Sequence, residues 1–236
     1  MLQERPVHQH HGVALHHGAL EVIRKGIDLA AQSLEVAAAD VEFKEGAFVV
    51  RGTDHKIGLT ELVQKHAGAG PHPLDTTLAT PVSAAFPSGV HVSEVEIDPD
   101  TGKIDLLRYV AVDDAGIIYN HAIVEGQLHG GLMQGIGQVF GEQIAYDPGT
   151  GQLLSGSFMD YFMPRADHLA PITLIDCGVP SPVNPLGAKG AGEAGATGSI
   201  PTLANAVLDA LAPLNVRQVE MPFTPERIWR AIHQRT

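Results

Sequence analysis

Cysteine is almost absent from this sequence of 236 residues, in which Cys177 is the single example. One thiol cannot form an internal disulfide, and it cannot hold an iron–sulfur cluster, which needs several thiolates. Any electron transfer through such a cluster must therefore use another polypeptide. Positive charge is also scarce, because 15 Lys and Arg residues stand against 27 Asp and Glu residues. The formal net charge of -12 argues against a phosphate backbone as partner, so we expect no nucleic-acid binding.

Long apolar runs and targeting signals are missing as well. No stretch approaches the roughly 20 apolar residues of a membrane-spanning helix, and Met1 to Ala14 lacks the features of a secretory signal. We therefore expect a globular protein of the cytoplasm, without a membrane span. Histidines near the start could bind a metal, although a mobile terminus fits this composition better. They are His8, His10, His11, His16 and His17.

The first 80 residues predict a helix–hairpin–helix module followed by a linker. Apolar residues recur at steps of three and four between Gly18 and Ala38, which indicates a one-sided helix. Two short alternating runs surround Glu45-Gly46, the pattern of a tight hairpin. Thr60 is expected to cap a short helix, and residues 67–81 form a connection rich in glycine and proline.

Residues 81–236 predict a second module, which combines strands and helices. Alternation over 89–98 and 103–113, with a turn between them, indicates two antiparallel strands. A helix over 125–140, a strand over 172–179 and a helix over 200–211 follow, the last with Pro201 in its first turn. The expected fold class is α+β, with mixed or antiparallel sheets flanked by helices.

The segment Gly187 to Gly198 contains five glycines around one carboxylate, Glu193, just before a predicted helix. Glycine permits close contact with a ligand, so the segment could press against a cofactor. A surface linker, with Glu193 favouring the positive end of the helix dipole, fits the composition equally well. Residues 190, 192 and 195 also match GxGxxG, but no strand directly precedes them as in a dinucleotide-binding turn.

A second glycine-rich segment, Glu125 to Gln138, carries three glutamines and His129 on one predicted helix. Each glycine costs about 1 kcal/mol in a helix interior, so tight packing or a ligand must compensate. Glutamine amides can both donate and accept hydrogen bonds, which suits the edge of a pterin. His129 and Cys177 are expected in the core, and the neighbouring acids Asp113 and Asp114 are expected to be structural.

Three strings occur in order along the chain: GQLHGGLMQGIGQ, GQLLSGSFMDYFMPRA and NPLGAKGAGEAGATGSIPTLANAVLDAL. With FPSGVHVSEVEIDPDTG and YVAVDDAGIIYN, they resemble the C-terminal part of the molybdopterin-binding large subunit of molybdenum hydroxylases. This family includes xanthine dehydrogenase, aldehyde oxidase and carbon monoxide dehydrogenase, and the last branch is the most similar. The resemblance extends from about Gly18 to Ile232. His121 departs from it, because the family usually has proline after the asparagine.

The resemblance implies a role for individual residues. Glu193 matches the catalytic glutamate that takes a proton from a molybdenum-bound hydroxide, so that water-derived oxygen attacks a substrate carbon. A carboxylate buried in a glycine loop should have a raised pKa, as a general base needs. Gln127 matches the glutamine that binds the pyranopterin. No protein ligand to the metal is expected, because the pterin sulfurs hold it. Four further residues would line the same loop: Lys189, Gly190, Ala191 and Gly192.

The resemblance also implies partners. The cofactor would be the molybdenum–pterin cofactor in its cytosine dinucleotide form, with an iron–sulfur cluster and FAD on partner subunits. The rest of the large subunit, or an N-terminal partner chain, would complete the site for a small-molecule substrate, and the assembly would be a homo-oligomer. The resemblance leaves four substrate classes open: a purine, an aldehyde, an N-heterocycle or carbon monoxide. The isolated piece is expected to be inactive, and a non-catalytic fragment or assembly module is the alternative.

Overall fold

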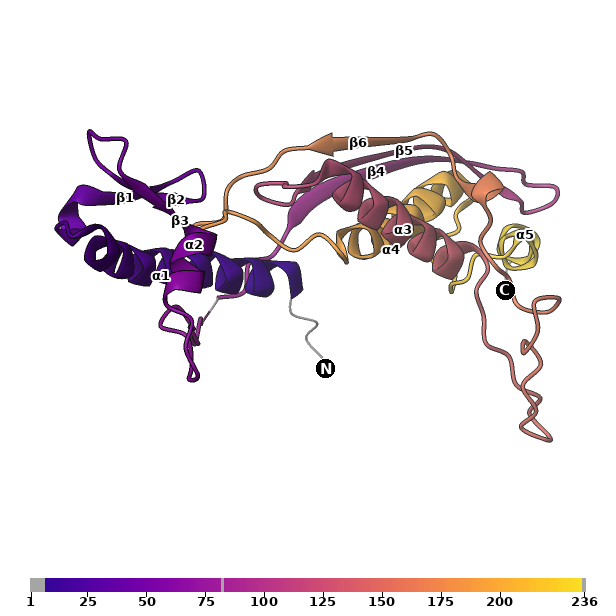
Figure 1. Ribbon diagram of the computed structural model, residues 1–236. Helices are drawn as coiled ribbons and strands as arrows, with labels where there is room; N and C mark the ends of the chain where they lie inside the picture. The colour runs from indigo at the N-terminus through magenta and orange to yellow at the C-terminus, as the bar shows by residue number, and fades with distance from the viewer. Residues whose placement is uncertain (1–6, 82, 235–236) are drawn as a thin grey trace. The chain divides into compact units, whose positions relative to one another are not determined.

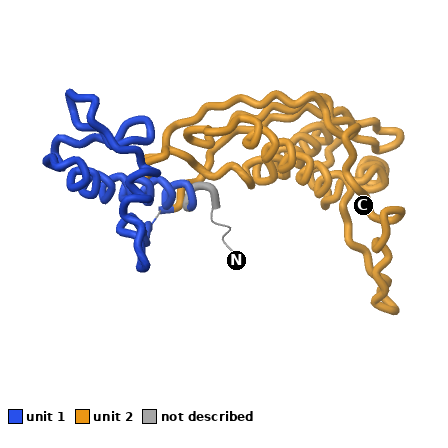
Figure 2. Tube along the Cα trace, in the orientation of Figure 1, with its two compact units in different colours: residues 1, 3, 5–83 blue, residues 2, 4, 84–236 orange. Residues whose placement is uncertain are grey.

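The computed structural model describes residues 7–81 and 83–234, with the backbone alone for residues 7–10. Two compact units meet in the chain between Ser83 and Ala84, as Figure 2 shows in two colours. The first unit consists of α1 (Val7–Leu34), β1 (Val41–Lys44), β2 (Ala47–Val50), β3 (Lys56–Gly58) and α2 (Leu59–Lys65), with a 3-10 turn at Ala38–Asp40. Its three strands form an antiparallel sheet in the order β1-β2-β3.

Helix α1 is longer at its start than the sequence pattern predicts. The expectation of a mobile terminus is wrong from residue 7 onward, because the histidine-rich segment continues the helix. The helix ends at Leu34 rather than at Ala38, since Glu35 adopts a positive φ of 56° and the Val36 N–H donates to the Ala31 carbonyl. No group of three metal-ligating side chains exists among the described residues, and the side chains of His8 and His10 lie outside them.

The hairpin predicted around Glu45 and Gly46 is confirmed. Both residues have positive φ, 50° and 81°, and the register pairs Lys44 with Ala47. Such a two-residue turn matches the right-handed twist of the two strands. Thr60, by contrast, does not cap α2, because the helix already begins at Leu59, with Gly58 at the N-cap. Phe48 and Leu62 are fully buried in the core of this unit.

The second unit contains a mixed three-stranded sheet. Its strands are β4 (Ser88–Ile97), β5 (Ile104–Asp114) and β6 (Ile172–Asp176), where β4 and β5 are antiparallel and β5 and β6 are parallel. The predicted α+β class and the predicted β4–β5 pair are confirmed. The helices α3 (His121–Phe140) and α4 (Ala194–Leu211) cover one face of this sheet, as Figure 1 shows, and α5 (Pro225–His233) follows. Short 3-10 turns occur at Ala166–His168 and Ala212–Leu214.

Helix α4 begins earlier than expected. The sequence predicted a loop up to Gly198 and Pro201 in the first turn, but the helix starts at Ala194 and encloses Pro201. Packing against α3 explains the difference. A Cβ at Gly131 would lie 2.7 Å from the Ala196 nitrogen, and one at Gly135 would lie 1.8 Å from the Ser199 hydroxyl. This close contact compensates for glycine's low helix propensity and shows that the two helices run in the same direction.

The sheet has a buried face and an open face. Tyr109 and Ala111 of β5 point into the core with Leu132 of α3 and Leu203 of α4. The alternate residues of the three strands point away from both helices. The register aligns them in two rows, Val90–Val112–Ile175 and Val92–Val110–Thr173.

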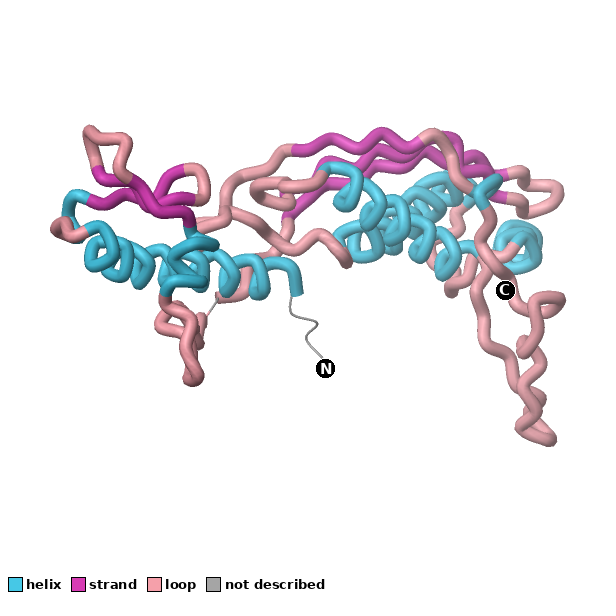
Figure 3. Tube along the Cα trace, in the orientation of Figure 1, coloured by secondary structure: helices cyan, strands magenta, loops and turns pink. Residues whose placement is uncertain are grey.

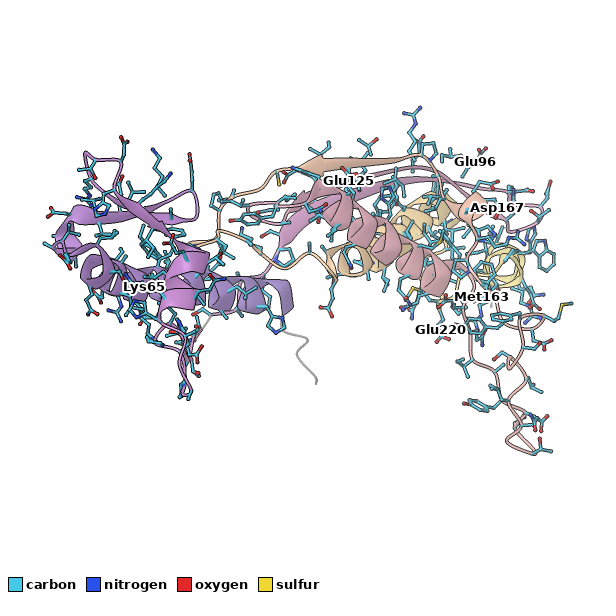
Figure 4. The ribbon with its side chains drawn as sticks, in the orientation of Figure 1. Lys65, Glu96, Glu125, Met163, Asp167 and Glu220 are labelled. Atoms are coloured by element: carbon cyan, nitrogen blue, oxygen red, sulfur yellow. The ribbon has the colours of Figure 1, made fainter. Side chains whose placement is uncertain are left out.

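Residues 143–163, here called the arm, connect α3 to the segment before β6. Figure 3 shows this loop extending from the helices and sheet of the second unit, and Met163, labelled in Figure 4, lies near its return. The arm contains a turn at 146–151, with Tyr146 bridged to Leu153. No helix in the described parts of the chain is long and apolar enough to cross a bilayer.

Candidate functional site

The candidate site lies where β5 and β6 end and where α3 and α4 begin. Strand β5 is followed closely by α3, and a loop over residues 177–193 leads from β6 to α4. Parallel strands with helical connections present their carboxyl ends and the helix N-termini at one edge, where such sheets commonly bind ligands. Glu125, labelled in Figure 4, marks this end of α3. The arrangement brings together the two glycine-rich segments that the sequence singled out.

The loop over 177–193 is built on the end of β5 and is not a free linker. Lys189 donates its backbone N–H to the Ala115 carbonyl, and Ile117 donates to the Gly187 carbonyl, both at 2.9 Å. The Asn184 side chain donates to the Ala188 carbonyl at 2.9 Å. These bonds fix the backbone of the loop up to residue 189. The interpretation of the segment as a surface linker is therefore wrong for this part.

Asp114 anchors the loop. Its Oδ1 atom accepts from the backbone N–H groups of Gly116 and Val179, each at 2.9 Å, and its Oδ2 atom accepts from the Lys189 ammonium. The hydrogen bond from Lys189 is the main cause that holds the pKa of Asp114 below its usual value, and the two N–H groups act in the same direction against the effect of burial. Lys189, predicted to line the cofactor loop, thus has its charge engaged with a carboxylate of the same unit.

The side chain of Gln127 lies near Gly192, the residue that precedes Glu193. A Cβ at Gly192 would lie 3.7 Å from the Gln127 Oε1 atom, so the amide faces the residue that precedes Glu193. Glu193 is the N-cap residue of α4, yet its side chain makes no capping hydrogen bond. Gln127, Gly192 and Glu193 are exposed, while Gly190 and Ala191 are half-buried. The structure therefore unites all six predicted residues at one edge of the second unit.

Three sequence-based expectations about side chains at this edge are wrong. Glu193 is exposed rather than buried, so the described residues do not provide the desolvation expected for it. His129 is exposed on α3, with its Nδ1 atom 2.8 Å from the Glu125 carbonyl, and Cys177 is exposed after β6. His129 and Cys177 were expected in the core. The type of one residue does not determine whether its face of a helix or loop is buried by other elements.

The neighbouring acids Asp113 and Asp114 do not act as a pair of acids. Asp113 is buried and lies 3.2 Å from the His91 Nε2 atom, whereas Asp114 binds Lys189. Sequence reasoning did not single out His91. The available signal was its position in an alternating strand, because the next residues on the same face of β4 are Ser93, Val95 and Ile97, all half-buried.

A nucleotide-binding turn is not present around Gly190. The strands β5 and β6 are parallel and joined through α3, so a βαβ arrangement precedes this segment in the chain. Even so, the long loop over 177–189 separates Gly190 from the end of β6. A phosphate-binding glycine turn follows its strand at once. The match to GxGxxG therefore has no structural counterpart.

Comparison with known proteins gives consistent matches over most of the chain. A family model described as the molybdopterin cofactor-binding domain matches residues 9–170. The carbon monoxide dehydrogenase large chain of Hydrogenophaga pseudoflava is 35% identical over 229 residues, which cover 94% of this chain and 28% of that protein. A crystal structure of the Cu,Mo-CO dehydrogenase matches with a TM-score of 0.81 and 34% identity, over 95% of this chain and 29% of the other. Quinoline 2-oxidoreductase from Pseudomonas putida 86 matches with a TM-score of 0.78 and 35% identity, over 92% and 29%. The chain spans less than a third of the length of these relatives.

Proposed function

This chain belongs to the molybdopterin cofactor-binding domain family, and we propose that it forms part of the active site of a molybdenum hydroxylase. The resemblance inferred from the glycine-rich strings is confirmed at the level of the family. The proposed reaction is the oxidation of a substrate carbon with water-derived oxygen. One observation carries the proposal for the residues: Gln127 lies against Gly192, beside Glu193, where α3 and α4 both begin.

The residues at this edge fit a molybdenum–pterin group. The exposed amide of Gln127 offers a donor and an acceptor to the edge of a pterin. The backbone of Gly190 to Gly192 leaves room for close approach, and two helix N-termini favour negatively charged groups such as phosphate. When bound, the group would supply the two-electron oxidation of the substrate. Lys189 would act indirectly, because its bond to Asp114 holds the loop in place.

Glu193 is proposed as the general base. Its exposed carboxylate makes no capping bond and is free to face a ligand at the start of α4. It would accept a proton at a carboxylate oxygen while the new carbon–oxygen bond forms. The water exclusion that such a base needs would come from the cofactor and from polypeptide beyond this chain. The substrate would be a small molecule whose class depends on that other polypeptide.

The proposed site requires further polypeptide, and exposed apolar surfaces of the second unit support this requirement. The outer rows of the sheet expose Val90, Val92 and Ile175, and the arm exposes 87% of Phe158 and 93% of Met159. Contiguous apolar patches of this kind mark interaction sites. We assign them to the remainder of the large subunit, because the relatives are more than three times as long as the aligned part.

Electrons would leave through partner subunits. The single exposed thiol cannot hold a cluster, so an iron–sulfur subunit and an FAD subunit would carry them. The cytosine dinucleotide form of the cofactor, the homo-oligomeric assembly and a cytoplasmic location also belong to the proposal. The apolar surfaces equally favour the alternative of a non-catalytic assembly module. The two functions differ in whether Glu193 is needed for turnover.

The test is Glu193→Gln in the complete enzyme that contains this segment. The substitution keeps size and most hydrogen bonding but removes the proton acceptor. We expect kcat to fall by about 10²–10⁴-fold, with molybdenum and pterin content unchanged. Glu226→Gln, which alters an exposed carboxylate in the first turn of α5, is the matched control. Wild-type turnover of Glu193→Gln with cofactor bound would refute base catalysis, and loss of cofactor would make Glu193 an anchor instead.

A further inference from the structure

A buried polar network lies under the start of α4. His91 of β4 faces Ala111 across the β4–β5 pair, so Tyr109 and Asp113 flank it on the same face of the sheet. The His91 Nδ1 atom lies 2.8 Å from the Tyr109 hydroxyl, and its Nε2 atom lies 3.2 Å from the Asp113 Oδ2 atom. The side chain of His91 is only 3% exposed. We call His91, Tyr109 and Asp113 the His91 network.

The contacts of His91 fit one tautomer of the neutral imidazole. Because a carboxylate accepts hydrogen bonds, the Nε2 atom of His91 donates to Asp113, and the Nδ1 atom accepts from Tyr109. Burial raises the pKa of Tyr109, so the phenol stays protonated and remains a donor. The imidazole is therefore held at both nitrogens, which fixes the plane of the ring.

Helix α4 rests directly on this ring. A Cβ at Gly198 would lie 2.3 Å from the Cε1 and Nδ1 atoms of His91. Thr202, one turn further along α4, donates its hydroxyl to the His91 carbonyl at 3.5 Å, and Ser93 donates to the Thr202 carbonyl at 3.4 Å. The first turns of α4 therefore lie in direct contact with the imidazole and with the backbone of β4.

The two neighbouring acids of β5 therefore hold the chain on both sides of Glu193. Asp114 binds Lys189, four residues before Glu193. Asp113 orients His91, which contacts Gly198, five residues after Glu193. A Cβ at Gly89 would lie 2.5 Å from the Asp113 Oδ1 atom, so Asp113 itself is closely enclosed. In the sequence, Glu193 therefore lies between two segments that are held at the end of β5, one by Asp114 and the other by Asp113 through His91.

We propose that His91 is a positioning residue for Glu193, acting through the seat that its imidazole provides for the first turns of α4. The inference rests on the proposed function of Glu193. Packing alone does not require a polar network here, because an apolar side chain of similar volume would fill the same space without burying a carboxylate and two further polar groups. The network adds orientation, and a displacement of about 1 Å at a reacting group can cost about 10²-fold in rate.

The experiment uses the complete cofactor-loaded enzyme with His91→Leu, His91→Gln and Tyr109→Phe. His91→Leu should lower kcat by about 10- to 100-fold, with KM and cofactor content little changed. His91→Gln keeps a donor towards Asp113 and should restore much of the loss. Tyr109→Phe keeps the ring and one of the two bonds to His91, and should have the smallest effect. A kcat of His91→Leu close to wild type in loaded enzyme would overturn the proposal.

Hydrogen exchange gives a readout that does not depend on turnover. His91→Leu should speed the exchange of amides in residues 190–199 but not in residues 204–211 of the same helix. Equal acceleration along all of α4, β4 and β5 would indicate an ordinary core role and would overturn the proposal. If His91→Leu fails to fold, Gly198→Ala carries the test, because its Cβ would push α4 off an intact imidazole. Unchanged kcat and exchange in both Gly198→Ala and His91→Gln would also refute it.

A double variant separates this inference from the proposed function. If His91 acts through Glu193, adding His91→Leu to Glu193→Gln should cause no further loss of kcat. Multiplicative losses would overturn the positioning role while leaving base catalysis in place. Wild-type turnover of Glu193→Gln would instead refute the proposed function, and the exchange of residues 190–199 would then decide by itself whether His91 seats α4.

Discussion

The ammonium group of Lys189 donates a hydrogen bond to the carboxylate of Asp114, and this pair joins the end of β5 to the loop that leads to Glu193. Both side chains are mostly buried. The carboxylate also accepts two backbone N–H groups, so its charge is satisfied from three directions. The stability of this corner should therefore depend on the ionisation of Asp114.

The first prediction concerns acid stability. Because the pKa of Asp114 is depressed in the folded state, the carboxylate stabilises the fold above its unfolded-state pKa of about 4, and this is lost as pH falls through the lower folded-state value. Urea unfolding should show wild type more stable than Asp114→Asn, by a constant difference from neutral pH down to about 5 that shrinks below about 4. Asp105→Asn, which breaks the exposed pair with Lys103, should cost at most about 1 kcal/mol. A stability difference for Asp114→Asn that is as large at pH 3 as at neutral pH would contradict the assignment.

The second prediction compares two adjacent glycines of α3. Gly131→Ala should destabilise this chain by about 1–3 kcal/mol, because its Cβ would enter the backbone of α4. Gly130→Ala should stabilise the chain by about 0.5–1 kcal/mol, since nothing lies within 4 Å of its Cβ position. Thermal unfolding of the two variants measures both effects. Equal stabilisation by both substitutions would show that α3 and α4 do not pack through these glycines.

The third prediction concerns cofactor retention in the complete enzyme. Gln127→Ala should weaken binding of the molybdenum–pterin cofactor by about tenfold, which corresponds to roughly 1.4 kcal/mol for a lost hydrogen bond. Molybdenum content should fall, while turnover per filled site changes less. Gln134→Ala removes an exposed amide from the same helix, seven residues further along, and serves as the control. Equal molybdenum loss in both variants would mean that Gln127 has no special contact.

The fourth prediction concerns the arm. Replacing Phe158 and Met159 together by serine should reduce self-association of this chain, because their side chains are almost fully exposed. The free energy of unfolding should change by less than about 0.5 kcal/mol. Analytical ultracentrifugation of the double variant measures the association. Leu15→Ser, at an exposed apolar position of α1, is the comparison, and an equal effect there would argue against a specific role of the arm.

Local patterns in the sequence were sufficient where neighbouring residues decide the conformation. Glu45-Gly46 specifies its hairpin because both residues tolerate positive φ, and the alternation in β4 and β5 specifies which side chains face the core. The glycine-rich strings around Gln127 and Glu193 were sufficient to identify the family. In each case the information lies within a short stretch of chain.

Tertiary contacts decided the rest. Glycine and proline near residue 200 predict a late helix start, but Gly131 and Gly135 of α3 allow α4 to pack closely and to begin at Ala194. Asp113 and Asp114 are adjacent and chemically identical, yet one binds His91 and the other Lys189, because successive strand residues face opposite directions and meet partners far away in the sequence. Glu193 is likewise exposed because of which elements pack against the start of α4. The residues next to Glu193 in the sequence do not determine that packing.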